Sequence, residues 1–382
     1  MDRWRVPLAD LSIEADDLEA VAAVYRSGWL TTGPRTAAFE RAFAEVVDRQ
    51  EAVAVSSGTA ALHLLLLAAG LGPGDEVIVP SLSFVATASA VAYTGAKPVF
   101  VDIESRTRPW LSAEGSEAAV GPRTAAIVAM PYGGHPGSLP ELAHVAGRHE
   151  LILLEDAAHA LGARVGERRV GAFGDGAAFS FFSNKPLAVG EGGMAVTARA
   201  DWAAAMRSLR SHGMTSGTWT RHRGHASGYD VVALGFNYRI DEPRAALGLS
   251  RLGRLEDERR CRERLDVRYR TLLDAIAGVE PGLPATAPGE ASAHHLFPAV
   301  LANHVDRDQV RRQLAERGIQ TSVHYRPIHQ MSLYAGEAPR LPMTEEYARR
   351  MVTLPLFAAM TDAQQDLVVE ELAGALAAAQ AA

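Results

Sequence analysis

The chain has 382 residues, of which 48% are hydrophobic and 22% are charged, and its formal net charge at pH 7 is −7. This length predicts two or three domains of an ordinary globular protein. The acidic balance argues against nucleic acid or an anionic membrane as the main partner, and no apolar run is long enough to span a bilayer. The one cysteine, Cys261, excludes an intramolecular disulfide, and the chain has no apolar signal core, so we expect a cytoplasmic protein.

Two helices are predicted in the first fifty residues. An amphipathic helix over residues 10–27 has acidic residues near its start and Gly28 after its end. The loop GWLTTGP, residues 28–34, leads to a second helix over residues 36–47. A plain connection between helices is the simplest interpretation of this loop.

Residues 51–156 alternate apolar runs with helical segments, a pattern that predicts a mostly parallel sheet with helices on both faces. Ligands bind such sheets at the carboxyl ends of the strands. The loops of interest therefore follow Val55, Val79, Met130 and Glu155.

The first of these loops, SSGTAAL at residues 56–62, runs from a strand through Gly58 into a helix. Backbone N–H groups and the helix dipole favour a phosphate at such a position. The alternative is an ordinary helix cap, for which Ser and Thr are common. There is no G-x-G-x-x-G or P-loop pattern, which argues against a dinucleotide or a nucleoside triphosphate.

Two further side chains follow strand ends. Phe84 could stack on a flat ring, or it could belong to the core. Asp156 ends the apolar run LILLED, and burying its carboxylate without a partner would be expensive. A pyridinium N–H would supply that partner; an arginine or a backbone amide is the alternative.

The segment 180–197 contains one lysine, Lys185, between the apolar runs 177–182 and 194–196. A lone lysine in a polar loop is usually solvated. Here two predicted strands hold the loop at both ends. An amine that forms a Schiff base and a carboxylate that holds a pyridinium nitrogen are what pyridoxal phosphate (PLP) requires of a protein. Together with Asp156, Lys185 predicts a PLP enzyme.

The rest of the chain predicts a helix after residue 200, a polar segment 212–229, and a loop leading into one long helix that ends near residue 276. The basic residues of the polar segment are Arg221, His222, Arg223 and His225. We then expect a small α+β domain with strands at 294–301 and 319–325, a helix capped by Asp306, and two closing helices, near Thr344 and from Thr361.

Ten segments in the same order resemble the DegT/StrS-type PLP-dependent sugar aminotransferases. They are GWLTTGP, SSGTAALHL, GDEVIVPSLSFVATASAV, GAKPVFVDI, EDAAHALGA, FSFFSNK, GEGGMAVT, GFNYRIDE, RGIQTSVHYRPIH and LPLFAAMTDAQQ. The resemblance covers nearly the whole chain. It implies the aspartate aminotransferase fold, with a large PLP-binding domain over residues 1–250 and a small C-terminal domain over residues 251–382.

The resemblance also implies roles for single residues. Lys185 corresponds to the Schiff-base lysine, Asp156 to the partner of the pyridine nitrogen, His159 to a residue near the ring oxygen, and Phe84 to the stacking aromatic. The implied phosphate site comprises Gly58, Thr59, Ala60 and Ser180, together with Asn237 from the second subunit of a homodimer. Arg239 is the alternative to Asn237 for that last contact. Pro186 departs from the family, which usually has Asn or Thr there.

The implied reaction transfers an amino group from glutamate or glutamine to the keto group of a nucleotide-linked (dTDP, UDP or GDP) sugar. The alternatives are a keto-cyclitol substrate, a PLP-dependent dehydratase on the same scaffold, and a regulator without activity. An intact Lys185 favours transamination over the branch of dehydratases that lack this lysine. The basic segment 212–229 either binds the substrate's pyrophosphate or is a solvated surface loop.

Overall fold

The computed structural model describes residues 4–224, 228–336 and 339–381. Its largest sheet has seven strands, and β9 is antiparallel to its neighbours β1 and β8, whereas the remaining pairs are parallel. Across the sheet the order is β1 (Glu51–Val55), β9 (Gly193–Thr197), β8 (Gly176–Ser180), β5 (Ile152–Asp156), β4 (Thr124–Ala129), β2 (Glu76–Pro80) and β3 (Lys97–Val101). The predicted α/β fold with a mostly parallel sheet is confirmed.

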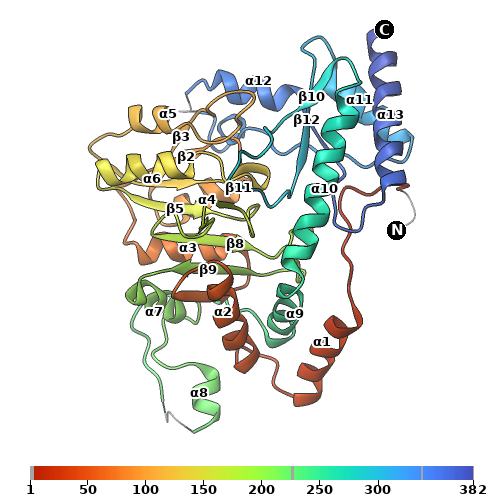
Figure 1. The fold of residues 1–382 in the computed structure, drawn as a ribbon. Helices are drawn as coiled ribbons and strands as arrows, with labels where there is room; N and C mark the ends of the chain where they lie inside the picture. Colours follow the sequence, from red (N-terminus) through yellow and green to blue (C-terminus); the bar gives the residue numbers. More distant parts are fainter. Residues whose placement is uncertain (1–3, 225–227, 337–338, 382) are drawn as a thin grey trace.

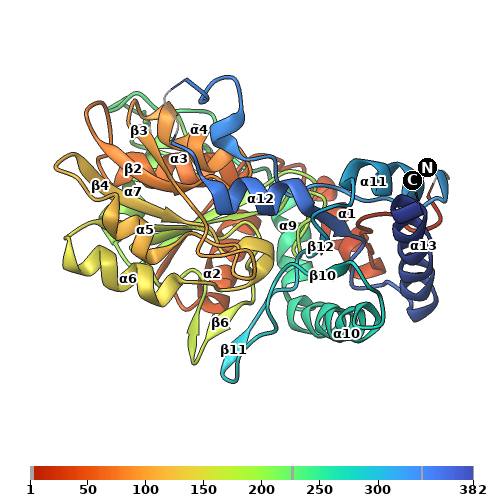
Figure 2. The ribbon, with the colours of Figure 1, turned by 90° about the horizontal axis from the view of Figure 1, so that it is seen from above.

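Helices cover both faces of this sheet (Figures 1 and 2). In β1, Val53 and Val55 belong to one apolar cluster, and Ala52 and Ala54 belong to the other, because successive side chains of a strand point to opposite faces. The first face carries α3 (Gly58–Ala68), α4 (Ala86–Tyr93) and α7 (Ala200–Leu209). The second carries α2 (Pro34–Val46), α5 (Ala113–Ala118) and α6 (Leu139–Arg148).

A third apolar cluster lies beside this body and includes Val6 from the start of the chain. It is built around the antiparallel sheet β10 (Val279–Pro281), β12 (Phe297–Leu301) and β13 (Met351–Leu354). The helices of this region are α10 (Leu255–Leu273), α11 (Arg307–Glu316), α12 (Pro342–Arg350) and α13 (Asp362–Ala381). The division of the chain at residue 250 stays a prediction.

The remaining elements are short or connect these parts. They are α1 (Ala15–Ser27), α8 (Thr218–His222), α9 (Glu242–Leu252), the 3₁₀ turns η1 (Tyr132–Gly134) and η2 (Ile328–Gln330), and the small sheet β6 (Arg164–Val165), β7 (Arg168–Arg169) and β11 (Glu290–Ala291). Within the described ranges no helix is both long and apolar enough to cross a membrane.

The prediction of one long helix ending near residue 276 is wrong, because the chain breaks between α9 and α10 at Gly253 and Arg254. Helix α9 packs against α1 and α2, whereas α10 packs against α13 and β10. Arg254 donates a hydrogen bond of 2.5 Å to the buried Asp17 of α1. Two different packing partners therefore set two helix directions, and glycine is a poor helix residue at the break.

The predicted strand at 319–325 is also wrong. This segment forms only single bridges, from Ile319 to Val6 and from Ser322 to Thr353. The place beside β12 is taken instead by β13, which the sequence did not predict. The polar segment 212–229 contains the short helix α8, and its His225 lies outside the described residues.

Several local signals hold. Gly28 ends α1 with a φ of 71°, and Asp306 caps α11 by accepting hydrogen bonds from the N–H groups of residues 308 and 309.

Glu242, at the start of α9, connects two segments that are far apart in the sequence. Its buried carboxylate accepts hydrogen bonds of 2.7–2.8 Å from the backbone N–H groups of residues 33, 35 and 36 at the start of α2.

Candidate active site

A cavity of about 390 Å³ lies at the carboxyl ends of β1, β5 and β8. Most of the predicted site residues line it: Gly58, Thr59, Phe84, Asp156, His159, Ser180 and Lys185. Since these strands run in the same direction, their carboxyl ends meet at one edge of the sheet, and residues more than 120 positions apart come together there.

The turn between β1 and α3 forms one wall of this cavity. The hydroxyl of Ser57 caps α3 and accepts a hydrogen bond of 3.1 Å from the N–H of Ala60. Ala60 is buried and is not part of the cavity wall, so the N–H groups of Gly58 and Thr59 are the first helical donors left for a ligand. A Cβ added to Gly58 would lie 2.9 Å from the Cβ of Ser180.

This wall fits the phosphate of PLP. The N-terminus of an 11-residue helix supplies backbone donors and the positive end of a dipole. The hydroxyls of Thr59 and Ser180 border the same cavity. Helix and strand approach so closely here that the backbone N–H groups remain accessible only while residue 58 has no side chain.

Asp156 is 8% exposed and ends β5 at the cavity wall. Its Oδ2 accepts a hydrogen bond of 2.6 Å from Thr87, whose hydroxyl lies 2.6 Å from that of Ser83. Because Thr87 donates its only hydroxyl proton to the carboxylate, Ser83 must donate to Thr87. Burial nevertheless raises the pKa of Asp156, since these neutral donors only partly offset it. A protonated ring nitrogen would compensate the buried charge.

Lys185 lies in the loop between β8 and β9, and its backbone N–H donates to the carbonyl of Phe182 at 2.8 Å. Its Nζ is 3.3 Å from Nε2 of His295. Burial lowers the pKa of Lys185 from 10.5 to about 8, against the opposing charge of Asp156. A sizeable fraction of the amine is therefore neutral near pH 7.5, and the neutral amine is the nucleophile that attacks a carbonyl group.

His159 is held in one tautomer by its two neighbours. The backbone N–H of Gly133 donates to Nδ1 at 3.3 Å, so Nε2 carries the proton and donates to the hydroxyl of Tyr325 at 2.8 Å. Burial holds the pKa of His159 well below its usual value, and the positive charge of Lys185 acts in the same direction. The cavity therefore presents a neutral imidazole beside the lysine.

The sequence motifs did not single out five residues of this site: Ser83, Thr87, His295, His324 and Tyr325. His324 and Tyr325 belong to a segment that was predicted to be a strand. The Tyr325 ring lies 5.9 Å from that of Phe84, which is 56% exposed at the cavity mouth. The pair HH at 294–295 was a usable signal, because two adjacent histidines in an apolar run are unusual for a plain strand.

Asn237 is exposed and does not line the cavity of its own chain. Its segment runs beside the end of β1, where the N–H of Ser56 donates to the carbonyl of Tyr238 at 2.8 Å and Arg239 pairs with Val55. Nη1 of Arg239 is buried without a hydrogen-bond partner among the described residues. The contact of either residue with a neighbouring subunit's phosphate stays a prediction.

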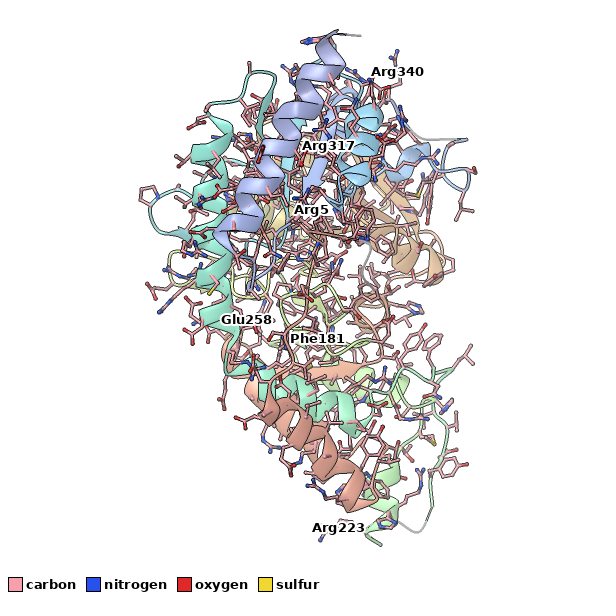
Figure 3. The ribbon with its side chains drawn as sticks, turned by 90° about the vertical axis from the view of Figure 1, so that its right-hand side faces the viewer. Arg5, Phe181, Arg223, Glu258, Arg317 and Arg340 are labelled. Atoms are coloured by element: carbon pink, nitrogen blue, oxygen red, sulfur yellow. The ribbon has the colours of Figure 1, made fainter. Side chains whose placement is uncertain are left out.

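The basic segment lies apart from this cavity. Arg221 stacks over Tyr229 at 4.8 Å, and Arg223 lies 5.9 Å from the ring centre of Trp219. Trp219 packs at 4.7 Å against Trp29, in the loop before α2. Figure 3 shows Arg223 at the opposite end of the molecule from Arg340. Binding of a pyrophosphate by this segment also stays a prediction.

Comparison with known proteins agrees with this geometry. The spore coat polysaccharide biosynthesis protein SpsC of Bacillus subtilis is 38% identical over 367 residues, 94% of both chains. DesV of S. venezuelae, whose structure holds a ketimine intermediate, is 37% identical with a TM-score of 0.89, over 97% of this chain and 98% of that one. Spr1654 of Streptococcus pneumoniae in its PLP form is 26% identical with a TM-score of 0.91, over 98% and 99%.

The model of the DegT/DnrJ/EryC1/StrS aminotransferase family matches residues 11–373. This match covers all three sheets described above, the lysine loop and the wall formed by the turn after β1. PLP is the cofactor of this family. The chain therefore belongs to the DegT/DnrJ/EryC1/StrS family and is a sugar aminotransferase.

Proposed function

We propose that this aminotransferase moves an amino group from glutamate or glutamine to the keto group of a nucleotide-linked sugar. The observation that carries the proposal is the pairing of Lys185, whose pKa is lowered to about 8, with the buried Asp156 in one cavity beside a phosphate-binding helix start. The relative SpsC, named for polysaccharide biosynthesis, supports an amino-sugar product.

PLP, when bound, supplies a ring that withdraws electrons from the carbon carrying the transferred amino group. Gly58, Thr59 and Ser180 would hold its phosphate, Phe84 would cover its ring, and Asp156 would keep a proton on the ring nitrogen. The neutral amine of Lys185 takes a proton from the α-carbon of the donor and later returns one to the acceptor. His159, fixed with its proton on Nε2, offers the ring oxygen a neutral neighbour.

The same proposal includes a homodimer in which Asn237 completes the site of the second subunit. Support comes from the position of Asn237 outside its own cavity. Large apolar side chains precede it in the chain, and Val231, Val232 and Leu234 are 55%, 65% and 91% exposed. Exposed apolar residues gathered in one segment are typical of a surface that a partner covers. We propose a cytoplasmic location, in keeping with nucleotide-linked substrates.

The test is to mix the purified enzyme, loaded with PLP, with glutamate or glutamine and a panel of dTDP-, UDP- and GDP-linked keto sugars. Formation of an amino sugar together with the donor's keto acid supports the proposal. Loss of water from the sugar without keto acid formation would indicate a dehydratase. Turnover of keto-cyclitols alone would show that the acceptor is a cyclitol and not a nucleotide-linked sugar.

A further inference from the structure

A second cavity, of about 290 Å³, shares Asn184 and Lys185 with the first. Its walls are residues 9–12 and 14 near the start of the chain, residues 183–186 of the lysine loop, Arg251 and Arg254, the first half of α10, His295, and residues 356–359. Figure 3 shows Glu258 on α10, the helix that forms one of these walls. The roles proposed above leave this cavity unexplained.

The most unusual group in its wall is the guanidinium of Arg262. The side chain is 5% exposed, and its Nη2 is buried without a hydrogen-bond acceptor among the described residues. Its Nε donates to the carbonyl of Ala293 at 3.3 Å, and Nη1 is 3.7 Å from Oε2 of Glu258. Burial lowers the pKa of Arg262 from 12.5 to about 10, which shows that its neighbours do not fully compensate its charge.

Among the charged side chains around Arg262, the arginines outnumber the buried carboxylates that could pair with them. Arg254 pairs with Asp17 at 2.5 Å, and Arg251 pairs with Glu258 at 3.2 Å. Glu258 is thus already held by another arginine when it faces Arg262. The other acids of the cavity, Asp10, Glu14 and Asp257, are exposed, so water screens their charge.

His295 connects this cation to the reacting lysine. Its ring is 6% exposed, lines the same cavity, and lies 3.3 Å from Nζ of Lys185. Burial lowers the pKa of His295 most, and the positive charges of Lys185 and Arg262 act in the same direction. His295 and Arg262 both line this cavity. A molecule in this cavity therefore has both Lys185 and Arg262 in the walls around it.

We infer that Arg262 binds a carboxylate of the amino donor. This inference rests on the proposed function, because an amino acid must reach the reacting amine while carrying at least one carboxylate. A guanidinium offers parallel N–H donors that match a carboxylate in geometry and charge. The sugar ring that must reach Lys185 is neutral, and the pyrophosphate of a nucleotide-linked sugar is the other anion that could compensate Arg262. KM for the donor and KM for the sugar therefore have to be measured separately.

The test compares Arg262→Gln and Arg262→Lys with Arg260→Gln in the enzyme loaded with PLP. Arg260 is on the same helix, and its side chain is 68% exposed, so its loss should leave donor binding unchanged. Loss of hydrogen bonds to a charged ligand should raise KM for glutamate about 10-fold to 100-fold in Arg262→Gln. Arg262→Lys keeps the positive charge but loses the parallel N–H donors of the guanidinium. Its KM for glutamate should therefore lie between those of the wild type and Arg262→Gln. KM for the keto sugar should not change.

Binding of glutarate, a dicarboxylate without an amino group, measured by titration calorimetry, separates binding from turnover. The wild-type enzyme and Arg260→Gln should bind it, and Arg262→Gln should not. Equal affinity of all variants, or no binding by the wild type, would overturn the role of Arg262 even if transamination proceeds. If the wild type forms no keto acid from any amino acid, the proposed function fails, whereas glutarate binding still decides the role of Arg262.

Discussion

At the scale of single residues, Lys185 is defined by its buried surroundings as much as by its identity. The chain has two lysines, and Lys97 is exposed at the sheet edge. Burial lowers the pKa of Lys185 to about 8, so its neutral, nucleophilic fraction grows as the pH rises through that value.

We therefore expect the rate at which PLP attaches to the cofactor-free protein to rise with pH, to reach half its maximum near pH 8, and to level off about one pH unit higher. Borohydride reduction and peptide mass analysis should find the pyridoxyl group on Lys185. Lys97→Arg should behave like the wild type, and Lys185→Arg should not be modified. Modification of Lys97 with equal efficiency would contradict the assignment.

The carboxylate of Asp156 accepts a hydrogen bond from the hydroxyl of Thr87, which in turn accepts one from the hydroxyl of Ser83. Asp156→Asn should lower turnover by more than about tenfold, which corresponds to ~1.4 kcal/mol of barrier, because an amide cannot stabilise a protonated ring nitrogen as a carboxylate does. Thr87→Val should lower turnover in the same direction but less, because the carboxylate loses one donor. Steady-state kinetics measure both, with Thr94→Val, directly after the end of the same helix, as the control. An unchanged rate in Asp156→Asn would remove its proposed role.

At the scale of elements, the site depends on the close contact of the start of α3 with the end of β8 and the start of β9. A Cβ added to Gly193 would lie 2.6 Å from the backbone N of Gly58, and backbone atoms cannot move aside as a flexible side chain can. The helix start that we propose for the phosphate is therefore fixed by two glycines, Gly58 and Gly193.

Gly193→Ala should destabilise the protein by about 1–3 kcal/mol, the usual cost of overpacking, and should weaken PLP retention. Thermal unfolding with and without PLP measures both effects. The control is Gly147→Ala in α6, where an added Cβ meets nothing within 4 Å and a small gain in stability is expected. Equal stability of the two variants would show that β9 can shift away from α3.

At the scale of the whole molecule, one chain supplies all the predicted wall residues of the first cavity except Ala60 and Asn237. Ala60 is buried, and its N–H donates to the capping hydroxyl of Ser57. Asn237 is exposed on the surface. If Asn237 contributes to the active site of the neighbouring subunit, a substitution of Lys185 affects the site of its own chain. A substitution of Asn237 then affects the site of the other chain.

Lys185→Ala and Asn237→Ala should each lose activity, and mixtures that exchange subunits should regain part of it, because one site in a mixed dimer has both residues. The control carries both substitutions in one chain and is mixed with Lys185→Ala, which gives no intact site. Activity of the mixture is measured after subunit exchange has been verified by mass. Absence of recovery would place Asn237 in its own chain's site or outside both.

The sequence by itself determined the parts of this protein that depend on a contiguous backbone. The strand ending in Asp156, the loop carrying Lys185 and the turn at Gly58 each combine an apolar run with a polar end, and that pattern is local. Helix ends such as those at Gly28 and Asp306 were predictable for the same reason.

Only the tertiary structure decided the partners of these residues. His295 reaches Lys185 across 110 positions, and Tyr325 reaches His159 across 166, without any periodicity that links them. The break at Gly253 and the choice of β13 over residues 319–325 as the strand beside β12 likewise followed from packing. Local propensity differs by less than the free energy of burying an apolar face, so the packing of distant segments selects among locally acceptable structures.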